Sequence, residues 1–338
     1  MDITRKADGS AGNDRQVAVS YPVDEEFERI NREVLGSDAR ITFLQQLPRE
    51  RWPDVLATAE VLLAWNLPRE VPAELLAAAR ALRFIQLLSA GVNQVDFRAI
   101  PDGVLVAGNV GAYAQPMAEH AMAMTLALAK RLPQHHAELA RGIFDQETPS
   151  LTLDGSAGGI LGFGGIGKAT ARLMRPFGAR IFAINTSGRT DEPVEFVGTL
   201  ADLDAVLGQL DVVIIALPLT RATRGLIDRR RLELMKPTAI LVNVARGAII
   251  DEGALYEHLR ANPQFCAGID AWWQEPFGEG SFGTNYPFFG LPNLLGSPHN
   301  SAIVPGILYR AARQAALNVR RFLHGEPVSG VVRREDYE

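Results

Sequence analysis

A glycine-rich turn in the middle of the chain constrains its fold more than any other feature. The stretch GILGFGGIGK contains the pattern G-x-G-x-x-G at Gly162, Gly164 and Gly167. An apolar run typical of a strand precedes this turn, a helical run at 169–177 follows it, and a second apolar run covers 180–184. In such a βαβ unit the first glycine permits a tight turn, the second lets backbone approach a pyrophosphate, and the third lets helix and strand pack closely.

The helix after this turn provides the rest of the predicted site. Its N-terminus presents backbone N–H groups and the positive end of the helix dipole, which both favour the pyrophosphate of a dinucleotide. We therefore expect cofactor contacts from Gly162, Gly164, Gly165, Ile166 and Gly167. A glycine-rich turn that binds no ligand is the alternative, but the strand-turn-helix-strand order favours a nucleotide.

Buried strands can be assigned on both sides of the glycine turn. Six runs of the central region are almost continuously apolar, as expected for strands that are buried on both faces of a sheet. They cover residues 159–162, 180–184, 212–217, 239–244, 267–271 and 293–296. Six such strands with helices between them predict a doubly wound Rossmann domain.

The first third of the chain shows a second alternation of strands and helices. Predicted strands cover 17–20, 41–44, 61–65, 84–88 and 104–107, and predicted helices cover 25–35, 52–59 and 72–81. This order indicates βαβ units and another parallel sheet. We therefore expect an α/β protein with two doubly wound parallel-sheet domains, in which a Rossmann dinucleotide-binding domain is inserted in a flavodoxin-like substrate domain.

Two long helices set the expected domain boundaries. A stretch rich in Ala, Met and Leu covers 116–141, and Pro133 is expected to kink this helix or end its first part. A final helix at 305–324 is expected to return to the first domain. The predicted organisation is a disordered N-terminus at 1–14, a discontinuous substrate-binding domain at 15–112 and 303–338, and a dinucleotide-binding domain at 113–302.

Composition argues against several other classes of protein. The chain has 338 residues, a formal net charge of −5 and no basic block, so nothing favours a nucleic-acid partner. Residues 1–15 are polar and unlike a signal peptide, and no apolar run is long enough to suggest a membrane span. The single cysteine, Cys266, allows no internal disulfide, is expected to pack in the core and fits a cytoplasmic protein.

The end of the second Rossmann strand discriminates between NAD and NADP. An acidic residue there binds the ribose hydroxyls of NAD and disfavours a 2′-phosphate. This chain instead has Asn185, Thr186 and Ser187, followed by Arg189, and its first carboxylate is Asp191. Because an arginine can pair with a phosphate, we expect NADP to be preferred, with NAD possible. Alternatively, Arg189 is a solvated loop residue and Asn185 binds ribose.

Polar residues end three later strands, where α/β sheets place their ligands. They are Arg246, then Asp270 with Glu275, and then His299. Reduction of a 2-oxo acid needs a cation for the carboxylate, a proton donor for the carbonyl oxygen and a hydride source. Arg246 offers a planar fork that matches a carboxylate, His299 can exchange the proton, and Glu275 can orient the imidazole. Asp270 could bind the nicotinamide carboxamide.

Taken alone, each of these residues has an ordinary structural explanation as a surface cation, a loop carboxylate or a hydrogen-bonded histidine. Their succession after a phosphate turn favours chemistry instead. The other histidines are assigned no role: His120 either touches the cleft or, as we expect, is a packed helix residue, and His135 and His136 are expected to be solvated. No histidine or carboxylate cluster has the spacing of a zinc site, so we expect no metal.

Together these segments resemble the D-isomer-specific 2-hydroxyacid dehydrogenase family, whose members reduce glyoxylate, hydroxypyruvate or pyruvate, or oxidise 3-phosphoglycerate, formate or phosphite. The resemblance is strongest over residues 87–302. The matching stretches are Ser89-Ala90-Gly91-Val92, Asn109-Val110, Ala118-Glu119-His120, the glycine turn, Leu217-Pro218-Leu219-Thr220, Asn243-Val244-Ala245-Arg246-Gly247, Glu275-Pro276 and Pro298-His299.

The resemblance implies a role for most of these segments. Arg246, Glu275 and His299 would be the catalytic residues, and backbone near Ala90 and Gly91 would hold the substrate carboxylate with Arg246 and His299. The expected reaction is hydride transfer between NAD(P)(H) and a small anionic D-2-hydroxy or 2-oxo acid. The remaining predicted cofactor contacts are Pro218 and Thr220 beside the adenosine half, Ala245 and Asp270 beside the nicotinamide, and also Leu217, Thr223 and Val244.

Two features depart from the family pattern. Asn185 replaces the usual acidic residue, and the segment 277–291 is longer and more aromatic than the usual loop between the glutamate and the histidine. This segment either shapes the substrate pocket or, as we expect, packs as a surface cluster beside the dinucleotide domain.

The partner and the reaction leave further alternatives open. The apolar face of helix 116–141 and the resemblance predict a homodimer, whereas burial of that helix within the monomer is the alternative. Besides the 2-hydroxyacid reaction, the sequence allows oxidation of anions such as phosphite or formate, or an NAD(H)-binding corepressor-like scaffold.

Overall fold

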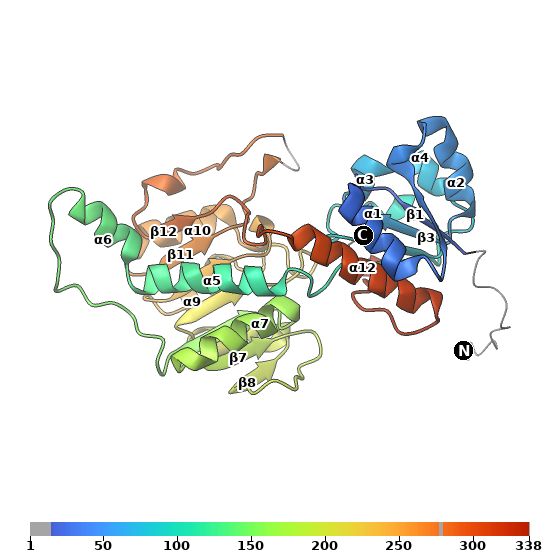
Figure 1. The fold of residues 1–338 in the computed structure, drawn as a ribbon. Coiled ribbons are helices and arrows are strands. Elements are labelled where there is room, and N and C mark those ends of the chain that lie inside the picture. The colour runs from blue at the N-terminus through green and yellow to red at the C-terminus, as the bar shows by residue number, and fades with distance from the viewer. Residues whose placement is uncertain (1–14, 277–279, 338) are drawn as a thin grey trace. The chain divides into compact units, whose positions relative to one another are not determined.

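The computed structural model describes residues 15–276 and 280–337. The chain divides into two compact units: unit 1 comprises Met1–Ala112 and Pro305–Glu338, and unit 2 comprises Tyr113–Val304. Unit 2 is therefore an insertion in unit 1 (Figure 1). The N-terminal residues for which disorder is predicted, 1–14, lie outside the described residues.

Unit 1 contains a five-stranded parallel sheet in the order β2-β1-β3-β4-β5. This is the flavodoxin-like order 2-1-3-4-5, and it confirms the predicted fold class of this part. The strands begin and end within two residues of their predicted limits. Their bounds are β1 Gln16–Val19, β2 Arg40–Phe43, β3 Val61–Ala64, β4 Phe84–Leu87 and β5 Leu105–Ala107.

Alternate strand residues of unit 1 face two helical layers. Val17 and Val19 pack in one buried cluster with side chains of α1 and α12, whereas Ala18 packs in a second cluster on the other face, with side chains of α2, α3 and α4. Both faces are apolar because both are covered. The bounds of these helices are α1 Glu25–Leu35, α2 Trp52–Thr58, α3 Leu67–Glu70, α4 Ala73–Ala77 and α12 Ile307–Leu323.

Unit 2 contains a seven-stranded parallel sheet in the order β12-β11-β10-β9-β6-β7-β8. Counted within the unit, this order is 3-2-1-4-5-6 of a Rossmann domain with a seventh strand added at one edge. The bounds are β6 Ala157–Leu161, β7 Arg180–Ile184, β8 Phe196–Gly198, β9 Val212–Ile215, β10 Ile240–Asn243, β11 Cys266–Ile269 and β12 Leu294–Gly296.

The prediction of six strands in this unit was wrong by one. The strand that it missed, β8, has only three residues, two of them half-buried and the third a glycine. It pairs with β7 from Phe182↔Phe196 to Ile184↔Gly198 at the sheet edge. Because β8 is short and partly solvated, it lacks the longer apolar run from which the other strands were predicted.

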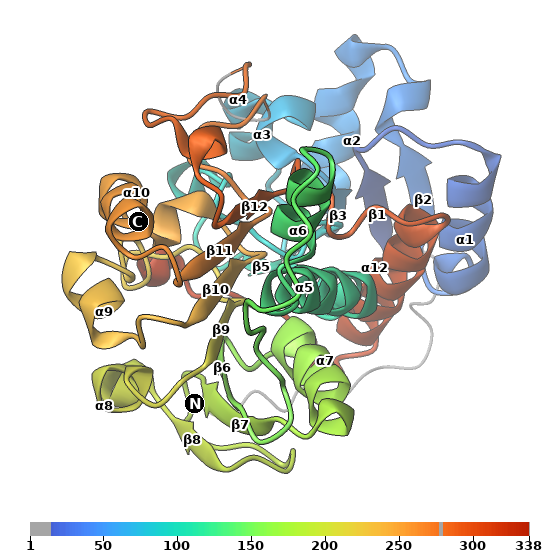
Figure 2. The same ribbon diagram turned by 90° about the vertical axis from the view of Figure 1, so that its left-hand side faces the viewer.

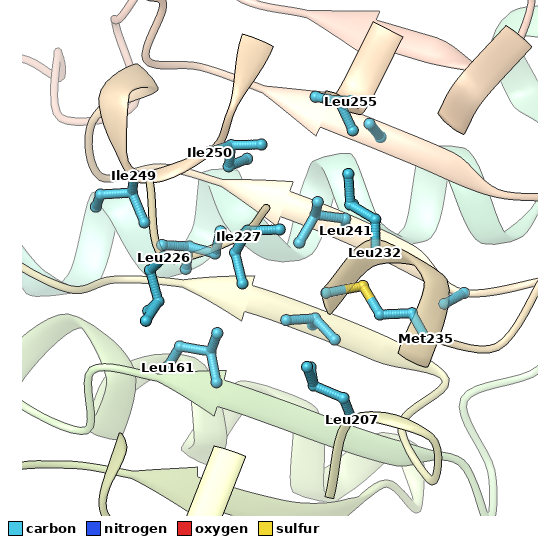
Figure 3. Packing of buried hydrophobic residues seen from close by; sticks show 14 of the residues in the cluster. Leu161, Leu207, Leu226, Ile227, Leu232, Met235, Leu241, Ile249, Ile250 and Leu255 are labelled. Atoms are coloured by element: carbon cyan, nitrogen blue, oxygen red, sulfur yellow. The ribbon is translucent and has the colours of Figure 1, made fainter. Parts of the chain in front are cut away.

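Helices cover both faces of the unit 2 sheet. Figure 2 shows α5 (Ala114–Ala129) and α7 (Gly165–Met174) on one side, and α8 (Leu203–Leu207), α9 (Arg229–Leu234) and α10 (Glu252–Ala261) on the other. In Figure 3 strand side chains interleave with those of the second set. Burial of each such side chain contributes about 1.5–3 kcal/mol, so this layer anchors the strand ends that carry the candidate site.

The long Ala- and Met-rich stretch forms two helices. α5 ends at Ala129, Arg131 adopts a left-handed φ of 52°, and α6 begins at Leu132 with a proline in its first turn. The break therefore lies just before Pro133, as the ring of a proline requires. Most of α5 is buried, and it packs against α7, β10 and β11 of the same unit. The apolar residues of α5 are thus largely covered within unit 2, as the alternative of burial within the monomer predicts for this part of the stretch, and the homodimer stays a prediction.

Two smaller expectations concern Cys266 and membrane spans. Cys266 is only half-buried at the start of β11, and burial raises the pKa of its thiol. The residues that follow it in β11 are fully buried, so the prediction of a core cysteine holds only in part.

Among the described residues, no helix combines the length and apolarity needed to cross a membrane.

Candidate active site

The glycine turn follows β6, whose neighbours β7 and β9 lie on either side of the point where the strand order reverses. Gly162 has a φ of 98°, and a Cβ there would lie 2.5 Å from the backbone of Ala216. A Cβ on Gly167 would lie 2.2 Å from the carbonyl oxygen of Gly162. The protein itself therefore requires the first and third glycines of the pattern.

The second glycine of the pattern has no such internal reason. A Cβ on Gly164 would meet no atom within 4 Å. Gly164 is the N-cap of α7, and no side chain caps this helix. An open space in front of an uncapped helix N-terminus fits an anionic group, so the turn at Gly162–Gly167 fits the pyrophosphate of the implied dinucleotide.

The loop after β7 is organised by the side chain of Asn185. Its Oδ1 accepts hydrogen bonds from the backbone N–H groups of Ser187, at 3.0 Å, and Gly188, at 2.7 Å. Its Nδ2 donates to the carbonyl oxygen of Arg189 at 2.8 Å. Asn185 therefore shapes the loop on which Thr186, Ser187 and Arg189 are exposed. A carboxylate could accept the same two N–H groups but could not donate the third hydrogen bond.

The charged side chains at positions 189 and 191 of this loop differ in their partners. The Arg189 guanidinium makes no ion pair or hydrogen bond within the part of the chain that the structure describes. The first carboxylate after β7, Asp191, lies 2.7 Å from the ammonium group of Lys168. The hydrogen bond from Lys168 lowers the pKa of Asp191 below its usual range. Asp191 is thus neutralised by a partner, whereas Arg189 is available to an anion.

The loop after β9 is held by a buried threonine. The hydroxyl of Thr223 donates to the carbonyl oxygen of Pro218 at 2.6 Å and accepts the N–H of Thr220 at 2.8 Å. Thr223 is buried, and Leu217, at the start of the loop, is buried as well. Thr223 therefore stabilises the loop whose residues are predicted to contact the adenosine half.

The turn after β10 positions Arg246. Asn243 is fully buried; its Nδ2 donates to the carbonyl oxygen of Arg246 at 2.9 Å, and its Oδ1 accepts the N–H of Ala245 at 3.0 Å. The Arg246 guanidinium is half-buried and donates to the carbonyl oxygen of Ala245 at 2.7 Å. Sequence reasoning gave Asn243 no function of its own, although an amide between Val242 and Val244 in a buried strand signals a satisfied polar group.

Glu275 and His299 are in direct contact. His299 Nδ1 lies 2.8 Å from Oε1 and 2.9 Å from Oε2 of Glu275. The N–H of Trp272 also donates to Oε1 at 2.7 Å. With Glu275 ionised, Nδ1 carries a hydrogen, so Nε2 is the imidazole nitrogen that can gain or lose a proton.

The surroundings of Glu275 keep it ionised. Burial opposes its charge, but the hydrogen bonds from His299 and Trp272 and the nearby charges of His299 and Arg246 outweigh burial, and the pKa of Glu275 is lowered. Arg246, Glu275 and His299, which follow the adjacent strands β10, β11 and β12, are thus brought together in unit 2.

Asp270 fixes the loop that carries His299. Its carboxylate is fully buried; Oδ1 accepts from Ser297 Oγ at 2.6 Å and Asn300 N–H at 3.1 Å, and Oδ2 accepts from Ser301 N–H at 3.3 Å. Burial opposes ionisation, but these hydrogen bonds lower the pKa of Asp270. Its predicted contact with the nicotinamide stays a prediction.

The predicted substrate contacts of unit 1 lie directly after β4. The side chain of Ser89 donates to the carbonyl oxygen of Gly91 at 2.9 Å and accepts from Gln94 Nε2 at 3.3 Å. Ala90 and Gly91 are only partly covered. The turn is therefore locally fixed.

The aromatic segment packs largely on unit 2, as expected. Phe288 is fully buried and stacks on Trp273 with ring centroids 5.4 Å apart. Tyr286 stacks on Tyr256 of α10 at 5.2 Å, whereas Phe282 remains half-exposed. Residues 277–279 of this segment lie outside the described residues.

Sequence spacing gave no candidate metal site, but one group of possible ligands exists among the described residues. His135, Glu138 and Asp145 place one ligand atom each within 4.8 Å of one another. Asp145 belongs to the segment after α6, which no helical spacing connects to His135. None of the three belongs to the candidate active site.

The comparisons with known proteins agree with this geometry. A sequence model of the NAD binding domain of D-isomer specific 2-hydroxyacid dehydrogenases matches residues 122–301. Glyoxylate reductase of Thermococcus kodakarensis is 31% identical over 300 residues, which cover 86% of this chain and 88% of the relative. The chain belongs to the D-isomer-specific 2-hydroxyacid dehydrogenase family.

Two further proteins show how far this similarity extends. D-3-phosphoglycerate dehydrogenase of Methanocaldococcus jannaschii is 29% identical over 321 residues, 94% of this chain but only 59% of that relative, so the chain spans little more than half of its length. The structure of a D-isomer specific 2-hydroxyacid dehydrogenase of Xanthobacter autotrophicus Py2, in complex with NADPH and MES, is 28% identical. Its TM-score is 0.74, and the match covers 95% of this chain and 98% of that chain.

Proposed function

We propose that this protein transfers a hydride between a nicotinamide dinucleotide and the 2-carbon of a small D-2-hydroxy or 2-oxo acid. Family membership supports oxidation of a 2-hydroxy acid or reduction of a 2-oxo acid, and the two relatives described above are a glyoxylate reductase and a D-3-phosphoglycerate dehydrogenase. The observation that carries the proposal is that both carboxylate oxygens of Glu275 lie within hydrogen-bond distance of Nδ1 of His299. That contact leaves one titratable nitrogen on a fixed imidazole beside a guanidinium.

Each residue of the site has a chemical task in this reaction. Arg246 binds the substrate carboxylate, aided by backbone N–H groups near Ala90 and Gly91. In reduction, His299 Nε2–H gives its proton to the 2-oxo oxygen, and in oxidation neutral Nε2 removes the proton of the 2-hydroxyl. Glu275 fixes the ring and stabilises the imidazolium. The bound nicotinamide supplies or accepts the hydride.

We also propose that NADP is preferred over NAD. The support is the loop after β7, where Asn185 occupies the position of the usual acidic residue and Arg189 is exposed. The structure of the Xanthobacter relative is a complex with NADPH and MES. Gly162–Gly167 would hold the pyrophosphate, and the loops at 217–223 and 244–245 would flank the cofactor.

A homodimer remains our proposal for the assembly, and the support comes from the C-terminal part of the stretch 116–141 and the segment after it. α6 (Leu132–Leu139) and the segment after it expose Leu132, Leu139, Ile143 and Phe144, at 58%, 57%, 48% and 74% of their surfaces. Exposed apolar side chains concentrated on one segment mark an interaction surface. Light scattering should show a dimer that Phe144→Asp converts to monomer; a monomeric wild type would refute this assembly.

The reaction is tested with a panel of substrates and both cofactors. Oxidation of NADPH and NADH by absorbance is compared for glyoxylate, hydroxypyruvate, pyruvate and longer 2-oxo acids, and cofactor reduction is measured for D- and L-2-hydroxy acids, formate and phosphite. We expect turnover with 2-oxo acids and with D-hydroxy acids only. Turnover with formate or phosphite alone, or cofactor binding without any turnover, would reject the proposal.

A further inference from the structure

His120 of α5 lies beside the candidate catalytic loop because of how α5 crosses the sheet. A Cβ on Gly268 of β11 would lie 3.3 Å from the Cβ of Met124, so helix and strand are in contact there. His120 lies one helical turn before Met124, about 6 Å of rise. Asp270 lies two residues after Gly268, about 6.6 Å of strand. The distance from Met124 back to His120 along α5 thus matches the distance from Gly268 forward to Asp270 along β11. A helix that runs antiparallel to the strand therefore places His120 beside Asp270, at the carboxyl end of β11.

Three side chains from three elements form a hydrogen-bonded chain at this place. His120 Nε2 lies 2.9 Å from Ser297 Oγ, and Ser297 Oγ donates to Asp270 Oδ1 at 2.6 Å. The serine hydroxyl has one hydrogen, and the carboxylate takes it. His120 Nε2–H must therefore be the donor to Ser297 Oγ. The distance from His120 Nε2 to Asp270 Oδ1 is 3.7 Å.

The carboxylate at the end of this chain holds the backbone around His299. Asp270 accepts the N–H groups of Asn300 and Ser301 through its side chain, and the N–H of His299 through its carbonyl oxygen at 2.9 Å. His299 has a φ of 51°, in the left-handed region that residues other than glycine rarely adopt. Surrounding contacts must hold such a conformation, and those of Asp270 lie on both sides of it.

We infer that His120 is a positioning residue of the reaction: by donating to Ser297 it orients the serine hydroxyl toward Asp270, and Asp270 then fixes the backbone conformation that aims His299. The inference rests on the proposed function, since it assumes that His299 exchanges the proton. His120 does not itself touch the reacting atoms in this scheme. Its loss should therefore lower kcat through a less ordered loop, with little change in substrate capture by Arg246.

Three variants separate positioning from simple packing. His120→Ala removes the donor, and Ser297→Ala removes the relay. His120→Gln restores a donor, because its Nε2 is as many bonds from the backbone as that of histidine. His324→Ala is the matched control, since this histidine is half-exposed and pairs with Asp38 in unit 1. The readouts are kcat and KM, and amide hydrogen exchange of residues 299–301.

We expect His120→Ala to lower kcat about tenfold, equivalent to 1.4 kcal/mol, with KM changed less than about threefold. Exchange at 299–301 should quicken about tenfold as the loop opens more often. His120→Gln should restore both to within about threefold of the wild type. Ser297→Ala should act like His120→Ala, and the double variant should be no worse than either, because both act on one hydrogen-bonded chain.

The outcomes distinguish this inference from the proposed function. Unchanged exchange at 299–301 in His120→Ala, or failure of His120→Gln to restore it, overturns the positioning role whether or not a substrate is known. A wild type that turns over none of the acids overturns the proposed function, while the exchange data still decide the role of His120. Additive losses in the double variant would also count against a single chain.

Discussion

The turns after β6 and β12 of unit 2 each hold a residue at positive φ, and they do so by opposite means. The turn after β6 uses glycine: Gly162 has a φ of 98° and fits because it lacks a Cβ. The turn after β12 uses His299, with a φ of 51°, and holds it with hydrogen bonds to Asp270 on the neighbouring strand. The glycine turn can be predicted from the local sequence, whereas the histidine turn depends on contacts between residues that are distant in the sequence.

The difference follows from what each turn must present. A phosphate turn presents backbone N–H groups, so small residues are sufficient and any side chain would be an obstacle. The loop after β12 must present an imidazole in one orientation, and glycine cannot replace it. Its conformational cost, about 1–2 kcal/mol for a left-handed residue, must be met by the buried carboxylate of Asp270 and by Trp272, whose indole N–H donates to the carbonyl oxygen of Ser297 at 2.8 Å.

The largest expected effect is that of His299 itself. His299→Ala should lower kcat by about 10²–10⁴, the usual contribution of a general acid or base, while the backbone hydrogen bonds between the loop and Asp270 can stay in place. Cofactor affinity, followed by quenching of tryptophan fluorescence, should stay within about threefold. Steady-state kinetics on the best substrate of the panel provide the measurement, with His324→Ala as control. A rate near that of the wild type would remove the proton-transfer role.

The glycine turn can be divided into a glycine that the protein needs and one that the ligand needs. Gly162→Ala should lower the free energy of unfolding by about 2 kcal/mol or more, because it combines backbone strain with a contact of 2.5 Å to the Ala216 backbone. Gly164→Ala should change stability by less than about 0.5 kcal/mol, since its Cβ would meet no atom within 4 Å.

Denaturant titration and calorimetric titration with NADP check this division. Gly164→Ala is expected to lose at least about tenfold in cofactor affinity, because a methyl group would stand where the pyrophosphate approaches. If Gly164→Ala instead bound the cofactor like the wild type, the open space beside α7 would have no connection with the ligand.

The same comparison shows what could be predicted from the sequence. The glycine turn and the apolar runs predicted two parallel sheets, because strands buried on both faces have to be apolar. The edge strand β8 was missed since it is short and half-solvated. The strand ends with Arg246, Glu275 and His299 could be singled out because carboxyl ends of parallel strands share one edge of the sheet.

The hydrogen bonds that support the candidate site could not be predicted from local sequence patterns. His120 and Ser297 are 177 residues apart in the sequence, and a histidine on an apolar helix has no local sign of its partner. The donors to the Asp270 carboxylate, Ser297, Asn300 and Ser301, are likewise 27 to 31 residues away in the sequence. Such roles depend on helix–strand register, which follows only from the packed structure.

Asp270→Asn should weaken the histidine turn without removing its chemistry. The amide would lose one acceptor oxygen toward three donors, so we expect a loss of about 1–3 kcal/mol in the free energy of unfolding at neutral pH. The folded-state pKa of Asp270 lies below its ordinary value of 3.8. Its stabilising contribution is therefore present above that value and is lost as the pH falls through the lower folded-state pKa.

The pH dependence gives this prediction a second measurement. The wild type should lose stability more steeply than Asp270→Asn below about pH 4, and the two curves should converge in acid. Denaturant titrations between neutral and acid pH are sufficient. Parallel curves would mean that the Asp270 carboxylate contributes no titratable stabilisation to the loop.

The smallest expected effect concerns the loop after β7, which a local side chain holds. Asn185 binds the backbone of Ser187, Gly188 and Arg189 and so resembles Asp270 in its role, but all its partners lie within four residues. Asn185→Asp keeps both backbone hydrogen bonds that Asn185 accepts and adds a negative charge. It should therefore lower kcat/KM with NADPH about tenfold and change kcat/KM with NADH much less.

Arg189→Ala should also lower kcat/KM with NADPH about tenfold. This is the low end for a charge-assisted hydrogen bond, because salt screens an exposed cation. Both variants are compared at one fixed ionic strength and again at higher salt, where the effect of Arg189 should shrink. A wild type that uses NADH at least as well as NADPH would show that Asn185 holds the loop and binds ribose without selecting the phosphate.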